Sequence, residues 1–310
     1  MRKYTKKKKS SGNAFIFMTL LVVLAMAVAG GLYFLTSHTE RGSERQEAVK
    51  TTEQQAAKKD TEDRKEQDEK SEIKSTEESK PEPKPAPKRY AGKLAIVVDD
   101  CGTDLNLLRK MLALNTPFSY AVLPNKQFSS DAVHIIKSKG NVALLHLPME
   151  PMDRAQMSEK NNTVQVAMSQ QEAADLTRKL LNSMPGVIGV NNHQGSRATS
   201  NEKTMQAVLR VIKAQGLFFI DSNTLAQSVG DKVATKMGVP TGRNDMFIDG
   251  STDVEEIKSK IWRAIATADK NGSAIAICHV RPNTVVAWQE VVADVKASGI
   301  TLVPVTALLR

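Results

Sequence analysis

Four apolar runs of this sequence end in side chains that can bind a metal or transfer a proton. The runs and the residues that follow them are 96–98 with Asp99 and Asp100, 143–145 with His146, 187–190 with Asn191, Asn192 and His193, and 274–278 with His279. Continuous apolar runs of this length are typical of strands buried on both faces of a parallel sheet. Catalytic groups of parallel α/β folds collect at the carboxyl ends of the strands. The sequence therefore predicts an enzyme site at that edge of a sheet.

These side chains suit metal-assisted acid–base chemistry. The adjacent carboxylates of Asp99 and Asp100 can divide the work, one binding a metal and the other acting as a base. Imidazole is a common zinc ligand and a carboxylate can be another, which makes His146, His193 and Glu150 candidate ligands.

Structural roles are the alternative for each of these groups. The acidic pair could be a helix cap for the segment starting at Asp104 plus a buried structural acid, and His146 could be satisfied by backbone groups at a loop edge. The polar stretch 191–197 could be a tight turn that uses Asn and Gly for left-handed conformations. We interpret His134, in the helical stretch 131–139, as a surface residue without a chemical role.

A further set of polar residues is predicted to contact substrate or to orient the ligands. They are Asn191, Asn192, Ser196, Arg197, Asp221, Ser222, Arg243, Asp245 and Arg281. Asp221 could orient a ligand histidine, or Ser222 or Thr224 could simply cap the next helix. Cys101 and Cys278 could be a disulfide, thiolate ligands or apolar fillers, and we favour fillers because no Cys-x-x-Cys spacing occurs.

Strand-like runs alternate with helical patterns over residues 90–310. The runs lie near 94–99, 118–123, 142–146, 187–191, 217–221, 274–279 and 300–304. Strings typical of a capping box begin at Ser169, Thr199 and Thr252. Glycines that follow helical stretches are Gly140, Gly216 and Gly299. The alternation predicts parallel strands with crossover helices in a complete or incomplete barrel, with a doubly wound open sheet as the alternative.

The N-terminal region has the pattern of a membrane anchor. Six basic residues within the first ten precede an uncharged, apolar run of 22 residues over 14–35. A helix needs about 20 such residues to span a bilayer, and basic residues ahead of it stay in the cytoplasm. We expect a basic cytoplasmic tail over 1–13 and one transmembrane helix over 14–35, uncleaved because the apolar run continues past Ala29. Nucleic-acid binding by the basic cluster, part of a net charge of +9, is the disfavoured alternative.

Residues 36–89 are predicted to be a disordered, charged linker between the membrane and the domain over 90–310. They are rich in Glu, Lys, Gln, Ser and Thr and end in a Pro-rich string over 81–88. Such a composition cannot bury enough apolar surface to offset its ordering entropy. A single exposed helix over 44–74 is the alternative.

The motifs of the domain, together and in this order, resemble those of the divergent polysaccharide deacetylase family. The strings that carry the resemblance are Val97-Val98-Asp99-Asp100-Cys101-Gly102, Phe118-Ser119-Tyr120-Ala121-Val122-Leu123-Pro124, His146-Leu147-Pro148-Met149-Glu150-Pro151, Asn191-Asn192-His193-Gln194-Gly195-Ser196, Phe219-Ile220-Asp221-Ser222 and His279-Val280-Arg281-Pro282. The resemblance covers about 93–310 and implies an irregular, seven-stranded parallel β/α barrel.

The resemblance also implies roles for individual residues. Deacetylases of the main family use an aspartate base, an aspartate ligand and two histidine ligands spaced His-x-x-x-His. By likeness, Asp99 is the base, Asp100 and His146 are metal ligands, and His279 is the acid that protonates the leaving group.

One position departs from that pattern. Glu150 stands where the second histidine of His-x-x-x-His belongs. His193, from the following motif, is then the expected third ligand, with Glu150 as the alternative. An Asp-His-His set with an open position suits a catalytic zinc ion.

The implied function is a membrane-anchored, metal-dependent deacetylase of an acetylated envelope carbohydrate, either peptidoglycan or another polysaccharide. Its catalytic domain is expected on the outer side of the cytoplasmic membrane. The Asp pair and His279 favour catalysis, whereas the missing His-x-x-x-His favours a non-catalytic carbohydrate- or partner-binding module on the same barrel. Another metal-dependent envelope hydrolase is the third possibility.

Overall fold

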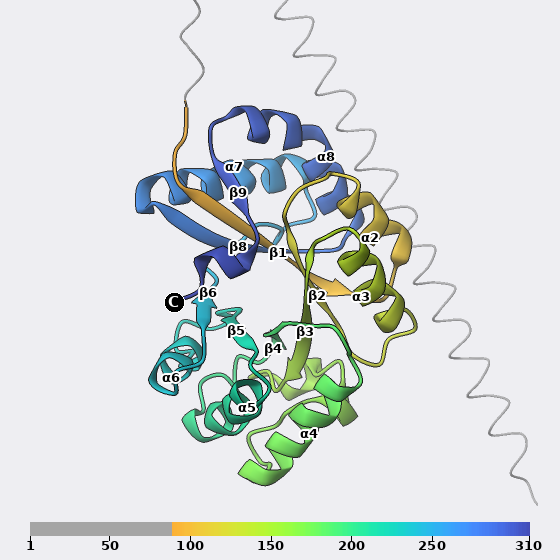
Figure 1. The fold of residues 1–310 in the computed structure, drawn as a ribbon, viewed down its shortest axis with the longest axis vertical. Coiled ribbons are helices and arrows are strands. Elements are labelled where there is room, and N and C mark those ends of the chain that lie inside the picture. The colour runs from red at the N-terminus through yellow and green to blue at the C-terminus, as the bar shows by residue number, and fades with distance from the viewer. Residues whose placement is uncertain (1–88) are drawn as a thin grey trace, which may run out of the picture. The chain divides into compact units, whose positions relative to one another are not determined.

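Nine parallel strands form one sheet in the computed structural model, which describes residues 89–310 (Figure 1). The strands are β1 (Lys93–Cys101), β2 (Ser119–Val122), β3 (Val142–Met149), β4 (Gly189–Gln194), β5 (Phe218–Asp221), β6 (Thr241–Arg243), β7 (Met246–Phe247), β8 (Ser273–His279) and β9 (Thr301–Val303). The helices of the described residues are α2 (Leu105–Leu112), α3 (Ser129–Ser138), α4 (Gln170–Asn182), α5 (Glu202–Ala214), α6 (Gly230–Lys236), α7 (Val254–Asn271) and α8 (Pro282–Ala297). Short 3-10 helices are η1 (Arg154–Gln156), η2 (Lys160–Asn162) and η3 (Val305–Leu308).

The predicted N-terminal segments lie almost entirely outside the described residues. These segments are the basic tail over 1–13, the anchor over 14–35 and all of the linker except Arg89. Between residues 89 and 310, none of the helices combines the length and the apolar character that crossing a membrane requires.

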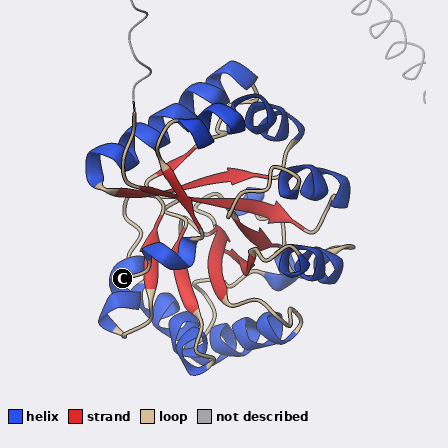
Figure 2. Ribbon diagram, turned by 45° about the horizontal axis from the view of Figure 1, so that its top comes forward, coloured by secondary structure: helices blue, strands red, loops and turns tan. Residues whose placement is uncertain are grey.

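The sheet curves until its two edges are joined by a short piece of chain. Its strands lie in the order β6-β5-β4-β3-β2-β1-β8-β7, with β9 paired to the first half of β1. Only Asn244 and Asp245 separate the two edge strands, β6 and β7. The amide of Asn244 donates to Asp221 O at 2.9 Å, and the amide of Asp245 donates to Ile275 O at 2.8 Å. Strands β1 to β6 follow one another in order, so the sheet is not doubly wound but a parallel half-barrel with its helices outside (Figure 2).

The seven predicted strands are all present, and two more complete the sheet. Strands β6 and β7 have three and two residues, which is too short for hydrophobic periodicity to reveal them. Alternate residues of β1 pack on opposite faces: Ala95 and Val97 join an inner cluster, while Leu94 and Ile96 face the helices. Burial on both faces explains why the strands are continuous apolar runs.

Caps set the starts of the helices. The predicted capping box that begins at Ser169 starts α4 as expected. In the two other predicted boxes the cap lies later in the chain, because Asn201 rather than Thr199 caps α5, and Asp253 rather than Thr252 caps α7. The predicted left-handed glycines at helix ends are Gly140, Gly216 and Gly299, with φ of +76°, +67° and +94°.

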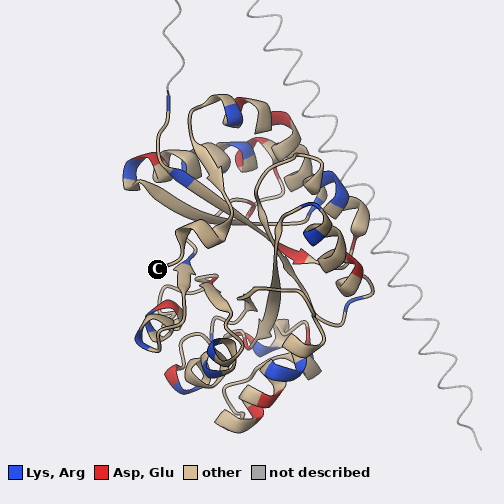
Figure 3. Ribbon diagram, in the orientation of Figure 1, with Lys and Arg blue, Asp and Glu red and all other residues tan. Residues whose placement is uncertain are grey.

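The register of the strands brings the predicted site residues to one edge. Asp99 pairs with His279 across β1 and β8, and His146 pairs with Asn191 across β3 and β4. His193 lies two residues further along β4. Most charged residues lie on the outer helices and loops, and the acidic end of β1 is an exception (Figure 3). The carboxyl edge of the half-barrel is therefore where the candidate site forms.

Candidate functional site

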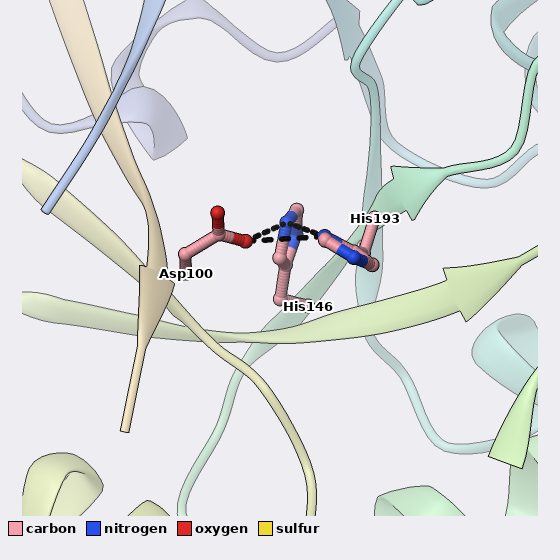
Figure 4. Close-up of side chains that lie close together, drawn as sticks. All are labelled: Asp100, His146 and His193. Carbon is pink, nitrogen blue, oxygen red and sulfur yellow. Dashed lines mark hydrogen bonds and ion pairs between the residues drawn. The ribbon is translucent and has the colours of Figure 1, made fainter. Parts of the chain in front are cut away.

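Asp100, His146 and His193 lie within contact of one another at the carboxyl edge (Figure 4). Asp100 Oδ1 lies 3.3 Å from His146 Nε2 and 3.1 Å from His193 Nδ1. The two imidazole nitrogens, His146 Nε2 and His193 Nδ1, are 3.1 Å apart. Asp100 and His193 lie one residue before the ends of β1 and β4, and His146 lies within β3, so three separate strands build the cluster.

A left-handed backbone conformation at Asp100 aims both neighbouring carboxylates at this cluster. Successive side chains of a strand normally point to opposite faces. Asp100 has φ of +62°, and the pairing of β1 with β2 is irregular between Val98 and Cys101. As a result Asp99 Oδ2 also approaches His146 Nε2, at 3.6 Å. Aspartate tolerates the left-handed region better than most residues, which allows the strand to end in this way.

Asn191 holds His146 and Asp99 together. Its Nδ2 donates to Asp99 Oδ1 at 2.8 Å, which leaves its Oδ1, 2.8 Å from His146 Nδ1, as the acceptor. His146 therefore carries a proton on Nδ1, and Nε2 is the nitrogen available to a metal.

Asp221 does not orient a histidine, contrary to that interpretation of the sequence. Its carboxylate accepts hydrogen bonds from the amides of Asn223 and Asp231 and from the hydroxyl of Ser228. It thereby fixes the loop after β5 and the start of α6. The hydroxyl of Thr224 donates to Gln194 O at 3.0 Å and caps no helix.

The cluster is strongly coupled electrostatically. Burial opposes the ionisation of Asp100, but the adjacent imidazoles of His146 and His193 outweigh it and hold the pKa of Asp100 well below its usual range. Burial also disfavours the charged form of His146, yet Asp99 and Asp100 raise the pKa of His146 to about 9. For Asp99 burial dominates and raises the pKa of its carboxyl, although both His146 and His279 act against it.

The geometry of the cluster fits a tetrahedral metal ion. Metal–ligand bonds of about 2.0–2.1 Å give a tetrahedron with edges of roughly 3.3–3.4 Å, close to the 3.1–3.3 Å that separate the three ligand atoms. Asp100 Oδ1 is also a buried oxygen with no hydrogen-bond partner. One carboxylate oxygen with two imidazole nitrogens is a donor set that zinc favours.

His279 forms a second unit with Asp249. Its Nδ1 lies 2.9 Å from Asp249 Oδ1, and its amide and the Thr284 hydroxyl both donate to Asp249 Oδ2 at 2.7 Å. Burial lowers the pKa of His279, but Asp249 and Asp99 outweigh this and raise it above the ordinary value. The sequence interpretation did not assign a site role to Asp249, although it follows the apolar pair Phe247-Ile248 in the same way that the other site residues follow their runs.

One cavity of about 340 Å³ joins these groups. Its lining residues are Asp99, Asp100, His146, Asn192, His193, Gln194, Ser222, Thr224, Phe247, His279 and Arg281. Three of the polar residues singled out in the sequence, Asn192, Ser222 and Arg281, line this cavity. Phe247 was missed, and its ring stacks on the imidazole of His279 with 6.1 Å between centroids.

Glu150 lies away from the cluster, so the alternative of Glu150 as third ligand has no geometric support. Its buried carboxylate accepts from the amide of Val166 at 2.7 Å and lies 3.1 Å from Arg154 Nε. Its carbonyl oxygen accepts from the amides of Arg197 and Ala198. Glu150 therefore ties the loop after β3 to the loop after β4.

Four other predicted contact residues do not line the cavity. The hydroxyl oxygen of Ser196 accepts from the amide of Met152, and Arg197 Nε lies 3.8 Å from Glu150 Oε1. Arg243 donates to Asn223 Oδ1, and Asp245 Oδ2 accepts from the amide of Ile275. These hydrogen bonds and the ion pair of Arg197 hold loops and the junction between the sheet edges. In the sequence, a polar residue with this role looks the same as one that contacts substrate.

The two cysteines are free and fully buried, in agreement with the filler interpretation. Burial raises the pKa of both thiols well above the ordinary value, so neither has the character of a thiolate ligand. His134 lies on the exposed face of α3, as predicted.

Comparisons with known proteins found similarity over 64% to 72% of the chain. The uncharacterized protein YibQ of Escherichia coli is 36% identical over 220 residues, which are 71% of this chain and 68% of the relative. An uncharacterized protein of Haemophilus influenzae is 34% identical over 197 residues, 64% of this chain and 70% of the relative. The crystal structure of an uncharacterized protein from Agrobacterium tumefaciens has the same fold, with a TM-score of 0.67 at 23% identity over 72% of this chain and 92% of the other.

The match to a family is the most specific of these findings. It extends over residues 96–309 and includes the cluster, Asp99 and the His279–Asp249 pair. The resemblance noted in the motifs is thereby confirmed, and the chain belongs to the divergent polysaccharide deacetylase family.

Proposed function

We propose that this protein is a metal-dependent deacetylase of an acetylated envelope carbohydrate. The observation that carries the proposal is one cavity in which Asp100, His146 and His193 face a common point, with Asp99 and His279 beside them. Asp100 Oδ1, His146 Nε2 and His193 Nδ1 would hold the metal, for which we propose zinc. A bound zinc ion polarises an acyl carbonyl and lowers the pKa of water.

Asp99 is the proposed general base. Hydrolysis of an acetyl group requires a proton to be taken from the attacking water. Asn191 fixes Asp99 Oδ1, which leaves Oδ2 for that proton. The raised pKa of the buried Asp99 carboxyl makes its ionised form a stronger base than an exposed aspartate.

His279 is the proposed general acid. Because its Nδ1 is held by Asp249, Nε2 is the nitrogen that can give a proton to the departing amine or alcohol oxygen. The bond from the acyl carbon to that nitrogen or oxygen breaks, and acetate and the free sugar group leave. Asp249 stabilises the charged imidazole before the transfer, as its effect on the pKa of His279 indicates.

Acetate release and metal content together test this function. The purified protein is assayed on a panel of acetylated glycans that includes peptidoglycan, beside Asp99→Asn and His279→Ala. Each variant should retain metal and lose about 10²–10⁴-fold in rate, because a general acid or base typically supplies that factor. Wild-type protein that binds metal and glycan but releases no acetate would favour the binding-module alternative, and release of another product would favour a different hydrolase.

We further propose that the domain lies outside the cytoplasm, tethered by residues 14–35 and the linker over 36–89. The basic cluster ahead of the apolar run supports this topology. Reporter enzymes fused after Ser37 should be active only if they function outside the cytoplasm. A fusion active in the cytoplasm contradicts both the topology and the envelope substrate.

A further inference from the structure

The two histidines of the cluster present different nitrogens to the metal position. His146 presents Nε2, whereas His193 presents Nδ1, which lies 3.1 Å from both Asp100 Oδ1 and His146 Nε2. A nitrogen that binds a metal carries no proton, so a neutral His193 must keep its proton on Nε2. A group that accepts the Nε2 proton of His193 therefore favours the tautomer in which Nδ1 is free to bind the metal.

That group is the hydroxyl of Ser158, whose Oγ lies 3.0 Å from His193 Nε2. His146 has the buried amide of Asn191 in the equivalent place. The side chain of His193 is 16% exposed, and the carboxylate paired with it, that of Asp100, lies on its Nδ1 side. Among the described residues that bond His193, Ser158 is thus the one placed to receive the Nε2 proton.

Ser158 is held in place by the long connection between β3 and α4. It lies between η1 and η2. Two residues before it, Gln156 O accepts from the side-chain amide of Gln194, which follows His193 in β4. Glu159, on its other side, pairs with Lys126 and accepts at its carbonyl from the hydroxyl of Thr163. The hydroxyl therefore reaches His193 from a segment that is anchored on both sides.

We propose that Ser158 is the positioning residue for His193: its oxygen accepts the Nε2 proton and leaves Nδ1 free for the metal. This inference rests on the proposed metal site. Residues that orient a ligand histidine are typically worth 10–100-fold in metal affinity. The exchange of Ser158 for alanine should therefore weaken zinc binding by about 10–100-fold without unfolding the protein.

Zinc titration of the full-length, metal-free protein against a competing chelator tests the proposal. Ser158→Ala should bind zinc more weakly, and Ser158→Thr, which keeps the hydroxyl, should bind like wild type. Ser196→Ala is the matched control, because this hydroxyl oxygen accepts from the amide of Met152 in the same region and contacts no histidine. With Co²⁺ in place of zinc, the visible spectrum of Ser158→Ala should change and that of Ser196→Ala should not.

A double variant separates positioning from a general effect on structure. His193→Ala should keep only a weak residual affinity for zinc, measured at higher zinc concentration, and if Ser158 acts through His193, adding Ser158→Ala should weaken that residual binding no further. An unchanged affinity and Co²⁺ spectrum in Ser158→Ala, with wild type binding metal, would overturn the role of Ser158 and leave the proposed function intact. Absence of metal binding by the wild type would overturn both.

Discussion

At the scale of single residues, the proposed third ligand is His193, whereas a His-x-x-x-His pattern would place that ligand at position 150, where this chain has Glu150. His193 Nδ1 faces Asp100 Oδ1 at the proposed metal site, and the carboxylate of Glu150 accepts from the amide of Val166. His193→Ala should lose metal while staying folded. Glu150→Ala should keep metal but lose about 1–3 kcal/mol of stability, because it leaves the partly buried amide of Val166 without its acceptor. Metal analysis after dialysis and urea unfolding measure the two effects, and metal loss from Glu150→Ala alone would make Glu150 the ligand.

The pairing of Asp249 with His279 predicts a pH dependence. Asp249 helps to hold the pKa of His279 above its ordinary value. An acid works only while protonated, so the deacetylation rate should fall as the pH rises through that pKa. Asp249→Asn removes the carboxylate, lowers the pKa of His279 and should move the alkaline limb of the pH–rate profile to lower pH. A control variant, Asp131→Asn at an exposed position of α3, should leave the alkaline limb where it is in the wild type. If the alkaline limb of Asp249→Asn is equally unmoved, His279 is not the acid.

At the scale of elements, β4 can pack against β5 as observed only with a glycine at its first position, Gly189. Gly189 pairs with Phe218 of β5, and a Cβ at position 189 would lie 2.3 Å from Cζ of the Phe218 ring. Gly189→Ala should destabilise the protein by roughly 1–3 kcal/mol, since the ring must move in a packed interface. Gly250→Ala is the control, because its Cβ would meet only Lys260 Nζ at 3.6 Å. Equal urea midpoints for the two variants would contradict the steric argument.

At the scale of the whole molecule, the half-barrel should be stable without the linker. The sheet and the site lie within residues 89–310, and the composition of 36–88 offers no core. The fragment over 90–310 should therefore melt at the same temperature as the fragment over 36–310. A fall of more than about 4 °C, which corresponds to ~1 kcal/mol or more for a domain of this size, would show that the linker contributes to folding.

The sequence by itself determined seven of the nine strands, the class of fold and most of the residues of the candidate site. Apolar runs that end in Asp99, His146 and His279 are local patterns, and burial on both faces of a parallel sheet produces them directly. Parallel strands place their carboxyl ends at one edge, so the residues that end them must meet. The family motifs added the expected roles, because they are also contiguous strings.

Only the tertiary structure decided which of these polar residues touch each other. The left-handed Asp100 brings two neighbouring carboxylates to one histidine. The imidazole of His146 is oriented by Asn191, 45 residues away in the chain. The imidazole of His193 faces Ser158, 35 residues away. A polar residue after an apolar run looks the same in the sequence whether it enters the cavity or ties two loops together, as Glu150 does. The difference lies in contacts between residues far apart in the chain, which are fixed only when the half-barrel closes.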